Sequence, residues 1–340
     1  MINIGILGCA HIARRSLIPA MLELKRYYKL VGIASRSFST AVSCAGQFNI
    51  EPFDGYQSLI NLDGLDAIYI PLPNSLHAEW IEKALDRGIH VLVEKSMACE
   101  YNEVLKLNEL AKRKGLVLVE NFQFRFHSQL TKLKQLINDG TIGELRCLRS
   151  SFGFPGLSSE NDIRYRKNLG GGALLDAGAY TLKIAQMLLG LDIKVCSANL
   201  NYQQGKEVDI WGGAYVKQKH GTLFGELAFG FNHFYQCNVE LWGSKGKLYT
   251  NRIFTAPPAY NPVFELETVE GKQEIKLPAD NHFNNMLIHF YELIQNRANR
   301  ADEYIQNINQ SRLIKELKEK AHENETDLCN NAFTGTSRRI

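Results

Sequence analysis

The sequence lacks the features that mark several common classes of protein. Its seven cysteines are scattered singly with no C-x-x-C pair, so we expect reduced thiols in a cytoplasm, with neither a disulfide framework nor a zinc site. The longest apolar region, residues 173–191, is interrupted by Asp176 and Lys183, so it does not predict a membrane span. Strand-like sequence begins at Ile2, and we expect no signal peptide. There is no basic block and the net charge is only +3, which argues against a nucleic-acid partner. These absences predict a cytoplasmic protein with no membrane, nucleic-acid or metal partner.

The length and the order of the predicted elements indicate two domains. A chain of 340 residues with 45% hydrophobic and 22% charged residues is typical of a globular protein with more than one core. Strands alternate with helices over residues 1–121, which predicts an α/β Rossmann domain with a doubly wound parallel sheet. Residues 122–324 carry many alternating strands and two closing helices, and predict an α+β domain with a large, mainly antiparallel, open-faced sheet. Residues 325–340 are polar and aperiodic, and predict a flexible tail.

A modified dinucleotide-binding fingerprint follows the first predicted strand. Residues 2–7 are apolar and lead into a G-x-A-x-x-A pattern over 8–13, which keeps only the first glycine of the usual G-x-G-x-x-G. A predicted helix over 12–24 and a strand over 30–34 complete a βαβ unit. The cofactor phosphates are therefore expected on the residues of this turn: Gly8, Cys9, Ala10, His11 and Ile12.

The end of the second predicted strand indicates which dinucleotide binds. An NAD site has an acid there, whereas NADP requires a cation or hydroxyl groups for its 2′-phosphate. This chain has Ser35-Arg36-Ser37, and Arg36 would pair with that phosphate. We therefore predict NADP(H), with a solvated surface arginine as the alternative.

A proline-bracketed loop follows the strand predicted over 66–71. In an open α/β sheet, such a loop at the carboxyl edge lies beside the ligand. We expect His77 to be structural or to contact the cofactor, and not to act as a base. The cofactor-contacting candidates of this loop are Pro71, Leu72, Asn74 and His77.

The stretch 89–97 places a charged pair at the end of a buried strand. Its apolar residues lead directly into Glu94 and Lys95, which are costly to bury unless they are partnered or functional. A salt-bridged strand end is the alternative interpretation.

A glycine run opens a helix in the second domain. Residues 170–172 are all glycine, which permits close backbone approach to a ligand. Asp176 and Tyr180 follow at a spacing of four, so they share one helix face. The alternative is that the two side chains hydrogen-bond to each other in the core.

Taken together, these motifs resemble the glucose–fructose oxidoreductase/inositol dehydrogenase (Gfo/Idh/MocA) family, over nearly the whole chain to about Asn324. The family's E-K-P motif stands here as Glu94-Lys95-Ser96, and its D-x-x-x-H motif as Asp176-x-x-x-Tyr180. The branch that it resembles more closely is that of the NADPH-dependent sugar 3-ketoreductases of nucleotide-linked deoxysugar pathways. The stretches that carry this resemblance are PLPNSLHAEW (71–80), ENFQFRFHSQ (120–129), DIRY (162–165), GGGALLDAGAY (170–180) and ELWGSKGKLYTNRIFTAPP (240–258).

Two residues depart from the family pattern. Ser96 replaces the proline of E-K-P, which frees a backbone position that proline would fix. Tyr180 replaces the histidine of D-x-x-x-H. A tyrosine with a pKa near 10 stays protonated and can donate to a forming alkoxide, so this replacement favours reduction of a ketone over oxidation of an alcohol.

The resemblance implies a reaction and a set of site residues. Hydride from NADPH is expected to reduce a ketone, at C3, of a nucleotide-linked deoxysugar, while Tyr180 donates the proton. Lys95 hydrogen-bonds the reacting oxygen and lowers the pKa of Tyr180, and Asp176 positions this pair or binds a sugar hydroxyl. The cofactor set then also includes Glu94, Lys95, Gln123 and Arg164. The substrate set is Lys95, Arg164, Tyr165, Asp176 and Tyr180.

Two alternatives remain open at this point. The chain could be an NADP-dependent dehydrogenase of a free sugar, inositol or trans-dihydrodiol, or a non-catalytic NADPH-binding protein. In each case the open sheet of the second domain predicts a homodimer or homotetramer.

Overall fold

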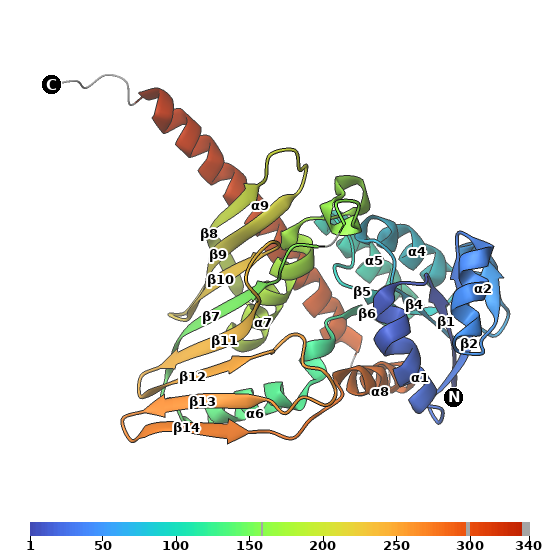
Figure 1. Cartoon of the computed structure of the whole chain (residues 1–340), viewed down its shortest axis with the longest axis horizontal. Helices are drawn as coiled ribbons and strands as arrows, with labels where there is room; N and C mark the ends of the chain where they lie inside the picture. The colour runs from blue at the N-terminus through green and yellow to red at the C-terminus, as the bar shows by residue number, and fades with distance from the viewer. Residues whose placement is uncertain (158, 297–299, 335–340) are drawn as a thin grey trace.

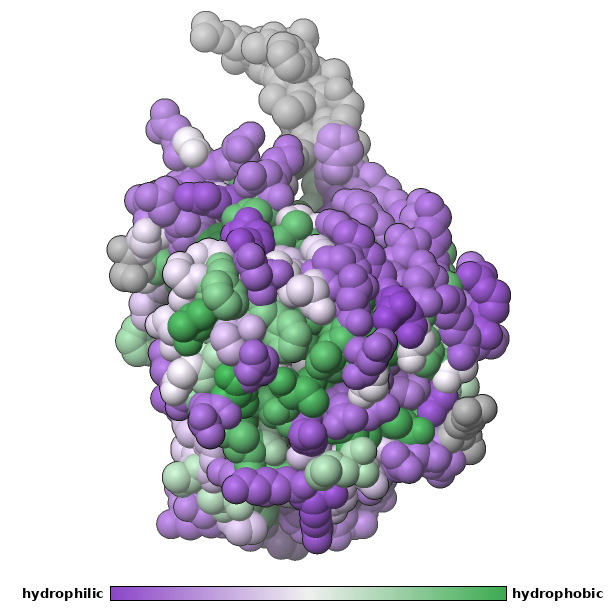
Figure 2. Space-filling view, turned by 90° about the vertical axis from the view of Figure 1, so that its right-hand side faces the viewer, coloured by the Kyte–Doolittle hydropathy of each residue, from purple (hydrophilic) through white to green (hydrophobic). Residues whose placement is uncertain are grey.

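The computed structural model of the protein describes residues 1–157, 159–296 and 300–334, with side chains up to Asn324. Two sheets dominate it, and they lie on opposite sides of the molecule (Figure 1). Figure 2 views the molecule from the side of the first sheet, where hydrophobic residues gather in the middle of a mostly hydrophilic face. No helix among the described residues has both the length and the apolarity needed to cross a membrane.

The first sheet is parallel throughout, with the strand order β3-β2-β1-β4-β5-β6. Its central strands are buried along their length because helices cover both faces. The strands are β1 Ile2–Leu7, β2 Tyr28–Ser35, β3 Pro52–Asp54, β4 Ala67–Ile70, β5 His90–Glu94 and β6 Leu118–Asn121. Among them lie α1 Ile18–Glu23, α2 Phe38–Gly46, α3 Tyr56–Ile60, α4 Asn74–Asp86 and α5 Tyr101–Lys114. The predicted Rossmann domain is confirmed, although a π-helical turn, Ala13–Leu17, precedes α1.

The second sheet has eight strands in the order β14-β13-β12-β11-β7-β10-β9-β8. Every neighbouring pair is antiparallel except β7 and β10. The strands are β7 Leu145–Gly153, β8 Ile193–Tyr202, β9 Asp209–Gln218, β10 Phe224–Gly230, β11 Gln236–Gly243, β12 Gly246–Asn251, β13 Val263–Thr268 and β14 Gly271–Lys276. Buried and exposed residues alternate along β8 and β10, so helices cover one face only. This confirms the predicted open-faced α+β domain, which also contains α6 Ser128–Asn138 and α7 Ala179–Leu189.

The last two helices differ from the prediction that both close the second domain. Helix α8, His282–Gln295, packs Phe283, Met286 and Phe290 into the core of the first domain. On the same face, the Tyr28 hydroxyl donates to the carbonyl of Leu287 at 2.6 Å. An apolar stripe predicts that a helix is buried but not against which sheet, and here the chain returns to the first one.

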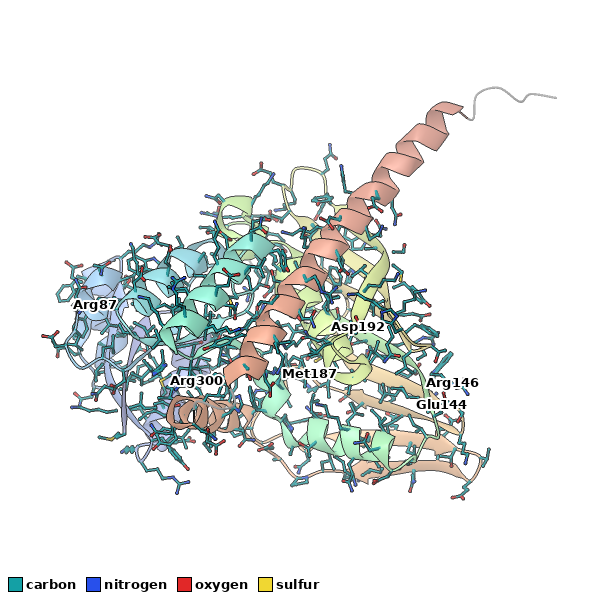
Figure 3. All side chains as sticks on the ribbon, turned by 180° about the vertical axis from the view of Figure 1, so that it is seen from behind. Arg87, Glu144, Arg146, Met187, Asp192 and Arg300 are labelled. Atoms are coloured by element: carbon teal, nitrogen blue, oxygen red, sulfur yellow. The ribbon has the colours of Figure 1, made fainter. Side chains whose placement is uncertain are left out.

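Helix α9, Arg300–Thr334, spans the junction of the two domains and crosses the back of the molecule (Figure 3). Asn307 donates to the Leu118 carbonyl of the first domain, whereas Leu313 and Leu317 belong to the core of the second. The helix continues to Thr334, beyond residue 324, where we predicted the start of a loose tail; residues 335–340 lie outside the described part. The predicted boundaries between the domains stay a prediction.

Candidate active site

Lys95 follows directly on β5, the strand between β4 and β6 in the parallel sheet. Its peptide bond to Ser96 is cis. The ammonium forms an ion pair with the carboxylate of Asp176 and also donates to the Asp176 carbonyl at 2.9 Å. The strand end predicted from the first domain and the helix start predicted from the second therefore meet at one point.

Asp176 lies in a π-helical turn, Leu174–Gly178, just before α7. Its second carboxylate oxygen accepts from Nε of Arg164 at 2.7 Å. Burial acts to raise the pKa of Asp176, but the charges of Lys95 and Arg164 outweigh this effect and lower the pKa to about 2. The carboxylate is thus ionised and pairs with two cations, so the alternative of a bond to Tyr180 is not what the structure shows. Arg164 is the partner that sequence reasoning did not connect to it.

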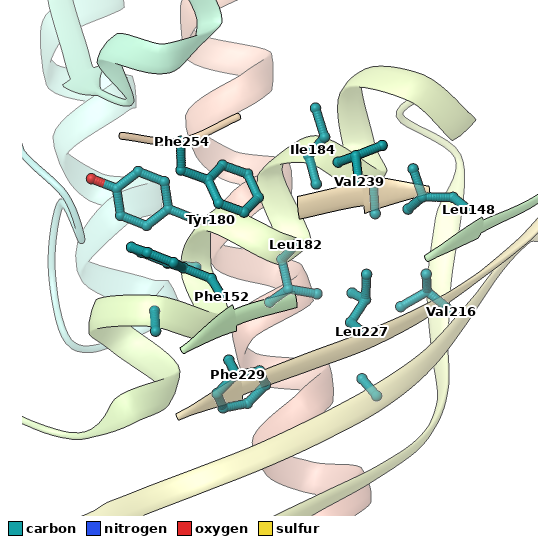
Figure 4. Close-up of a cluster of buried hydrophobic side chains, with 14 of the residues drawn as sticks. Leu148, Phe152, Tyr180, Leu182, Ile184, Val216, Leu227, Phe229, Val239 and Phe254 are labelled. Carbon is teal, nitrogen blue, oxygen red and sulfur yellow. The ribbon is translucent and has the colours of Figure 1, made fainter. Parts of the chain in front are cut away.

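The ring of Tyr180 is enclosed by four phenylalanines. Figure 4 shows it against Phe152 and Phe254, with its hydroxyl at the edge of the hydrophobic cluster. The ring centroids of Phe122, Phe124, Phe152 and Phe254 lie 5.4, 5.7, 5.1 and 5.5 Å from that of Tyr180. These contacts fix the orientation of the ring, because aromatic pairs favour tilted and edge-to-face packing at such distances.

The electrostatic surroundings of Tyr180 differ from those we predicted. Burial, followed by the negative charge of Glu94, raises the pKa of the Tyr180 hydroxyl well above its ordinary value, and a hydrogen bond with Gln123 offsets only part of this rise. Nζ of Lys95 lies over the ring, 5.1 Å from its centroid, and bonds Asp176. The predicted lowering of the tyrosine pKa by Lys95 is therefore not found. The hydroxyl stays protonated at ordinary pH.

Glu94 is held by residues at the ends of the neighbouring strands. One of its carboxylate oxygens accepts from the Tyr69 hydroxyl at 2.6 Å and from Nδ2 of Asn121 at 2.7 Å. Burial raises its pKa, although these two bonds and Lys95 oppose the effect. Sequence reasoning missed both partners, although the strand register pairs Glu94 with Asn121.

The turn after β1 has the shape that the predicted dinucleotide site needs. Gly8 has a φ of +115°, and a Cβ there would lie 2.9 Å from Cδ2 of Leu72. Glycine therefore lets this turn approach the loop after β4, which contains Pro71 and Leu72. The amide of Arg14 donates to the Ala10 carbonyl at 3.2 Å, so the amides that precede it at this helix start can serve a phosphate.

The end of β2 gathers cationic and hydroxyl groups, as predicted. Arg36 hydrogen-bonds the side chain of Tyr56, and the Ser37 hydroxyl lies 2.8 Å from that of Ser39. Burial raises the pKa of the Cys9 thiol to about 12, while Arg14 and a hydrogen bond to Ser35 oppose this. Arg14 is a nearby cation that sequence reasoning missed. The sequence around Ser35 contains no acidic residue, but the sheet brings one beside it. Asp54, at the end of β3, is paired in register with Ser35.

His77 makes contacts that suit a structural residue, one of the two roles predicted for it. Its side chain is fully buried. Nδ1 lies 2.8 Å from the Ser96 carbonyl and Nε2 lies 2.8 Å from the Leu72 carbonyl. Burial lowers its pKa to about 4, so the imidazole is neutral. The side chain is enclosed by protein groups, and its predicted contact with the cofactor stays a prediction. The neighbouring Asn74 donates to the Gly170 carbonyl at 2.8 Å and thereby links the cofactor domain to the second domain.

The glycine run approaches protein groups closely, and its predicted approach to a ligand stays a prediction. A Cβ at Gly171 would lie 2.4 Å from the Arg164 carbonyl, and one at Gly172, which has a φ of +111°, would lie 2.4 Å from Oδ1 of Asp209. Asp209 in turn accepts from the amide of Leu174 at 2.6 Å. The run therefore positions the turn that carries Asp176.

Arg164 and Tyr165 are adjacent in sequence, but their side chains contact different residues. Arg164 pairs with Asp162 and Asp176, and the charge of Asp176 is the main cause of its raised pKa. The Tyr165 hydroxyl donates to Oδ1 of Asn232 at 3.2 Å. The guanidinium of Arg164 thus pairs with two carboxylates, and its predicted contacts with cofactor and substrate stay predictions.

Comparison with known proteins gives consistent matches over both domains. Residues 2–122 match a family described as an oxidoreductase family with an NAD-binding Rossmann fold, and residues 130–249 match the GFO/IDH/MocA C-terminal domain. The dTDP-3,4-didehydro-2,6-dideoxy-alpha-D-glucose 3-reductase of Actinomadura kijaniata is 38% identical over 293 residues, 86% of this chain and 87% of that protein. The reductase of the same name from Streptomyces violaceoruber is 35% identical over 329 residues, 94% of this chain and 96% of that protein.

A solved structure agrees with the fold. It is that of KijD10, a 3-ketoreductase from Actinomadura kijaniata, in complex with NADP and TDP-benzene. Its TM-score is 0.90 at 35% sequence identity, with 94% of this chain and 97% of that chain covered. With both family domains matched and the paired Lys95 and Asp176 beside Tyr180, the chain belongs to the Gfo/Idh/MocA family of oxidoreductases.

Proposed function

We propose that this protein uses NADPH to reduce a keto group, at C3, on a nucleotide-linked deoxysugar. The observation that carries the proposal is the junction at Lys95, where an ammonium paired with Asp176 lies beside the buried, protonated Tyr180. The relatives support it, since those named above are 3-reductases of a dTDP-linked keto-sugar.

The first domain fits NADPH, which would supply the hydride. The turn at Gly8 and the free amides of the following helix start suit the pyrophosphate. Ser35, Arg36 and Ser37 suit the 2′-phosphate, because a guanidinium and hydroxyls bind a phosphate that a carboxylate would repel. KijD10, which is 35% identical, was solved with NADP bound.

Tyr180 is the group that would deliver the proton. Burial keeps its hydroxyl protonated, so it can donate to an oxygen that gains negative charge during reduction. The phenylalanines around it exclude water from one side of the ring. The hydroxyl that donates the proton is therefore held in one position, at the edge of the phenylalanine cluster.

Lys95 supplies positive charge and a hydrogen bond at the same place. A lysine ammonium has three N–H groups, and two of them are directed at the carbonyl and carboxylate of Asp176. The third is available to a substrate oxygen, where it would stabilise the forming alkoxide. Asp176 keeps the ammonium in place, and Arg164 fixes the other oxygen of Asp176.

The test uses single substitutions and two classes of substrate. Lys95→Ala and Tyr180→Phe should each lower kcat for NADPH oxidation with a dTDP-linked 3-keto-sugar by roughly 100-fold or more, with NADPH affinity nearly unchanged. Tyr215→Phe is the matched control, because Tyr215 lies exposed on β9. Unchanged turnover in both site variants would contradict the proposal. Faster NADP reduction with free sugars, inositol or a trans-dihydrodiol would favour the dehydrogenase alternative, and cofactor binding without any turnover would favour a non-catalytic protein.

The open face of the second sheet supports a homodimer or homotetramer in the cytoplasm as the working form. Large aromatic residues are exposed along it, including Trp211 and Tyr215 on β9 and Trp242 on β11, and Arg149 stacks on Trp242 at 3.9 Å. Exposed aromatic and arginine side chains are enriched at protein interfaces. Light scattering of the purified protein tests this: a monomer at micromolar concentration would contradict it.

A further inference from the structure

Ser96 stands where the family motif has proline, and it makes a contact that proline cannot make. Its side chain is buried, with 1% of its surface exposed. Its hydroxyl donates to the carbonyl of Leu175 at 3.1 Å. Leu175 directly precedes Asp176, so this bond joins the two domains one residue away from the Lys95–Asp176 pair.

The two bonds form a parallel pair of links between the same two segments. Lys95 and Ser96 are consecutive at the end of β5, and their partners Leu175 and Asp176 are consecutive in the π-helical turn. A lysine side chain has four rotatable bonds, so its ion pair alone holds the backbones at no fixed separation. The serine hydroxyl is attached through a single rotatable bond and fixes that separation.

Side chains of the first domain contact the backbone next to Ser96 and hold it in place. The two ring nitrogens of His77 lie 2.8 Å from the Ser96 carbonyl and from the Leu72 carbonyl of the loop beside the cofactor turn, and the neutral ring can donate to one of them. The amide of Met97 donates to the buried Glu120 at 2.8 Å. The peptide group between Ser96 and Met97 is thus held by side chains of the first domain, and the Ser96 hydroxyl connects this fixed segment to the second domain.

We propose that Ser96 is a positioning residue for the reduction. Its bond to Leu175 sets the distance between the Lys95 ammonium and the turn that leads to Tyr180, and so aligns the cation with the proton donor. This inference rests on the proposed function, because it concerns how Lys95 and Tyr180 act together.

Ser96→Ala and Ser96→Pro test the role, since both remove the hydroxyl and proline restores the family residue. Each should lower kcat by roughly 10- to 100-fold, which is the range for a small misplacement of a catalytic group, while KM for NADPH stays unchanged. Ser150→Ala is the matched control. Ser150 is also 1% exposed, and its hydroxyl also donates to a backbone carbonyl, that of Asn238 at 2.9 Å, but it lies within the second sheet. This control should lose stability and retain kcat.

A double-substitution cycle separates positioning from a general structural role. If Ser96 acts through Lys95, adding Ser96→Ala to Lys95→Ala should lower kcat no further. A further fall by the full factor, or a normal kcat in Ser96→Ala alone, would overturn the inference. Neither result would affect the proposed function as long as Lys95→Ala by itself lowers kcat strongly while retaining measurable turnover. Full activity of Lys95→Ala would overturn the proposed function and this inference together.

Discussion

At the scale of single residues, the site contains a few ionisable side chains whose protonation states depend on the residues they contact. Asp176 shows this most clearly, because its pKa falls from an ordinary value of 3.8 to about 2. A carboxylate whose pKa is lower in the folded state stabilises the fold at pH values above its unfolded pKa. That contribution, about 2 kcal/mol for a shift of this size, is lost as the pH falls from about 5 towards 2.

Asp176→Asn should therefore be less stable than the wild type by an amount that depends on pH. At neutral pH the asparagine leaves Lys95 and Arg164 without their anion, so the free energy of unfolding should fall by about 2 kcal/mol or more. As the pH drops towards 3, the carboxyl becomes protonated in the unfolded state while it stays largely ionised in the folded state, so the difference should shrink. Urea unfolding at a series of pH values measures this, and a difference that stayed constant from pH 7 to about pH 3 would contradict the assigned ion pairs.

The sequence predicted the identity of the reacting residues better than their surroundings. Lys95, Asp176 and Tyr180 followed from motifs with a fixed spacing, and the structure brings them together. Arg164 was assigned to both cofactor and substrate and Glu94 to the cofactor, because a sequence does not show which charged groups will pair. The pKa of Tyr180 was predicted in the wrong direction for a related reason. It depends on burial by four phenylalanines that are distant in the chain, among them Phe152 on β7 and Phe254 in the turn after β12.

At the scale of elements, the strands were predicted well and the destinations of the helices were not. Short apolar runs between helices indicated the fully buried strands of the first sheet, and period-two alternation indicated the half-buried strands of the second. Helix α8 has an apolar stripe that either sheet could bury. It packs on the first, where Phe290 and Met286 are fully buried against residues such as Ile4. The π-helical turn before α7 was also missed, since nothing in GGGALLDAG distinguishes it from an ordinary helix start.

Phe290→Ala tests the assignment of α8 to the core of the first domain. Removing a fully buried phenylalanine should lower the free energy of unfolding by about 3–5 kcal/mol, and the loss should appear in the first domain. We expect weaker NADPH binding and faster amide exchange in β1 and α1. Phe234→Ala is the control, because Phe234 is 87% exposed and should change stability little. Exchange that increased only in the second sheet would contradict the assignment.

At the scale of the whole molecule, the two domains share their elements and are not independent along the chain. Helix α9 joins both cores: Tyr304 packs in the first, and its hydroxyl bonds the Leu116 carbonyl, while Leu313 packs in the second. The site lies where these shared elements hold the domains together. Lys95, Ser96 and Asn74 on one side contact Asp176, Leu175 and Gly170 on the other.

This sharing has a consequence for the predicted domain of residues 1–121. A fragment that ends there lacks α8, so the face of the sheet that contains Tyr28 and Ile4 would lose the cover of Phe290, Met286 and Leu287. It also lacks α9, which satisfies the Leu118 carbonyl through Asn307. We expect the fragment to be unfolded or aggregated and not to bind NADPH, whereas the full chain binds it. Near-UV circular dichroism and a fluorescence titration with NADPH measure both properties. A folded, NADPH-binding fragment would show that α8 covers the sheet without being needed, and the boundary at residue 121 would then stand as a true domain limit.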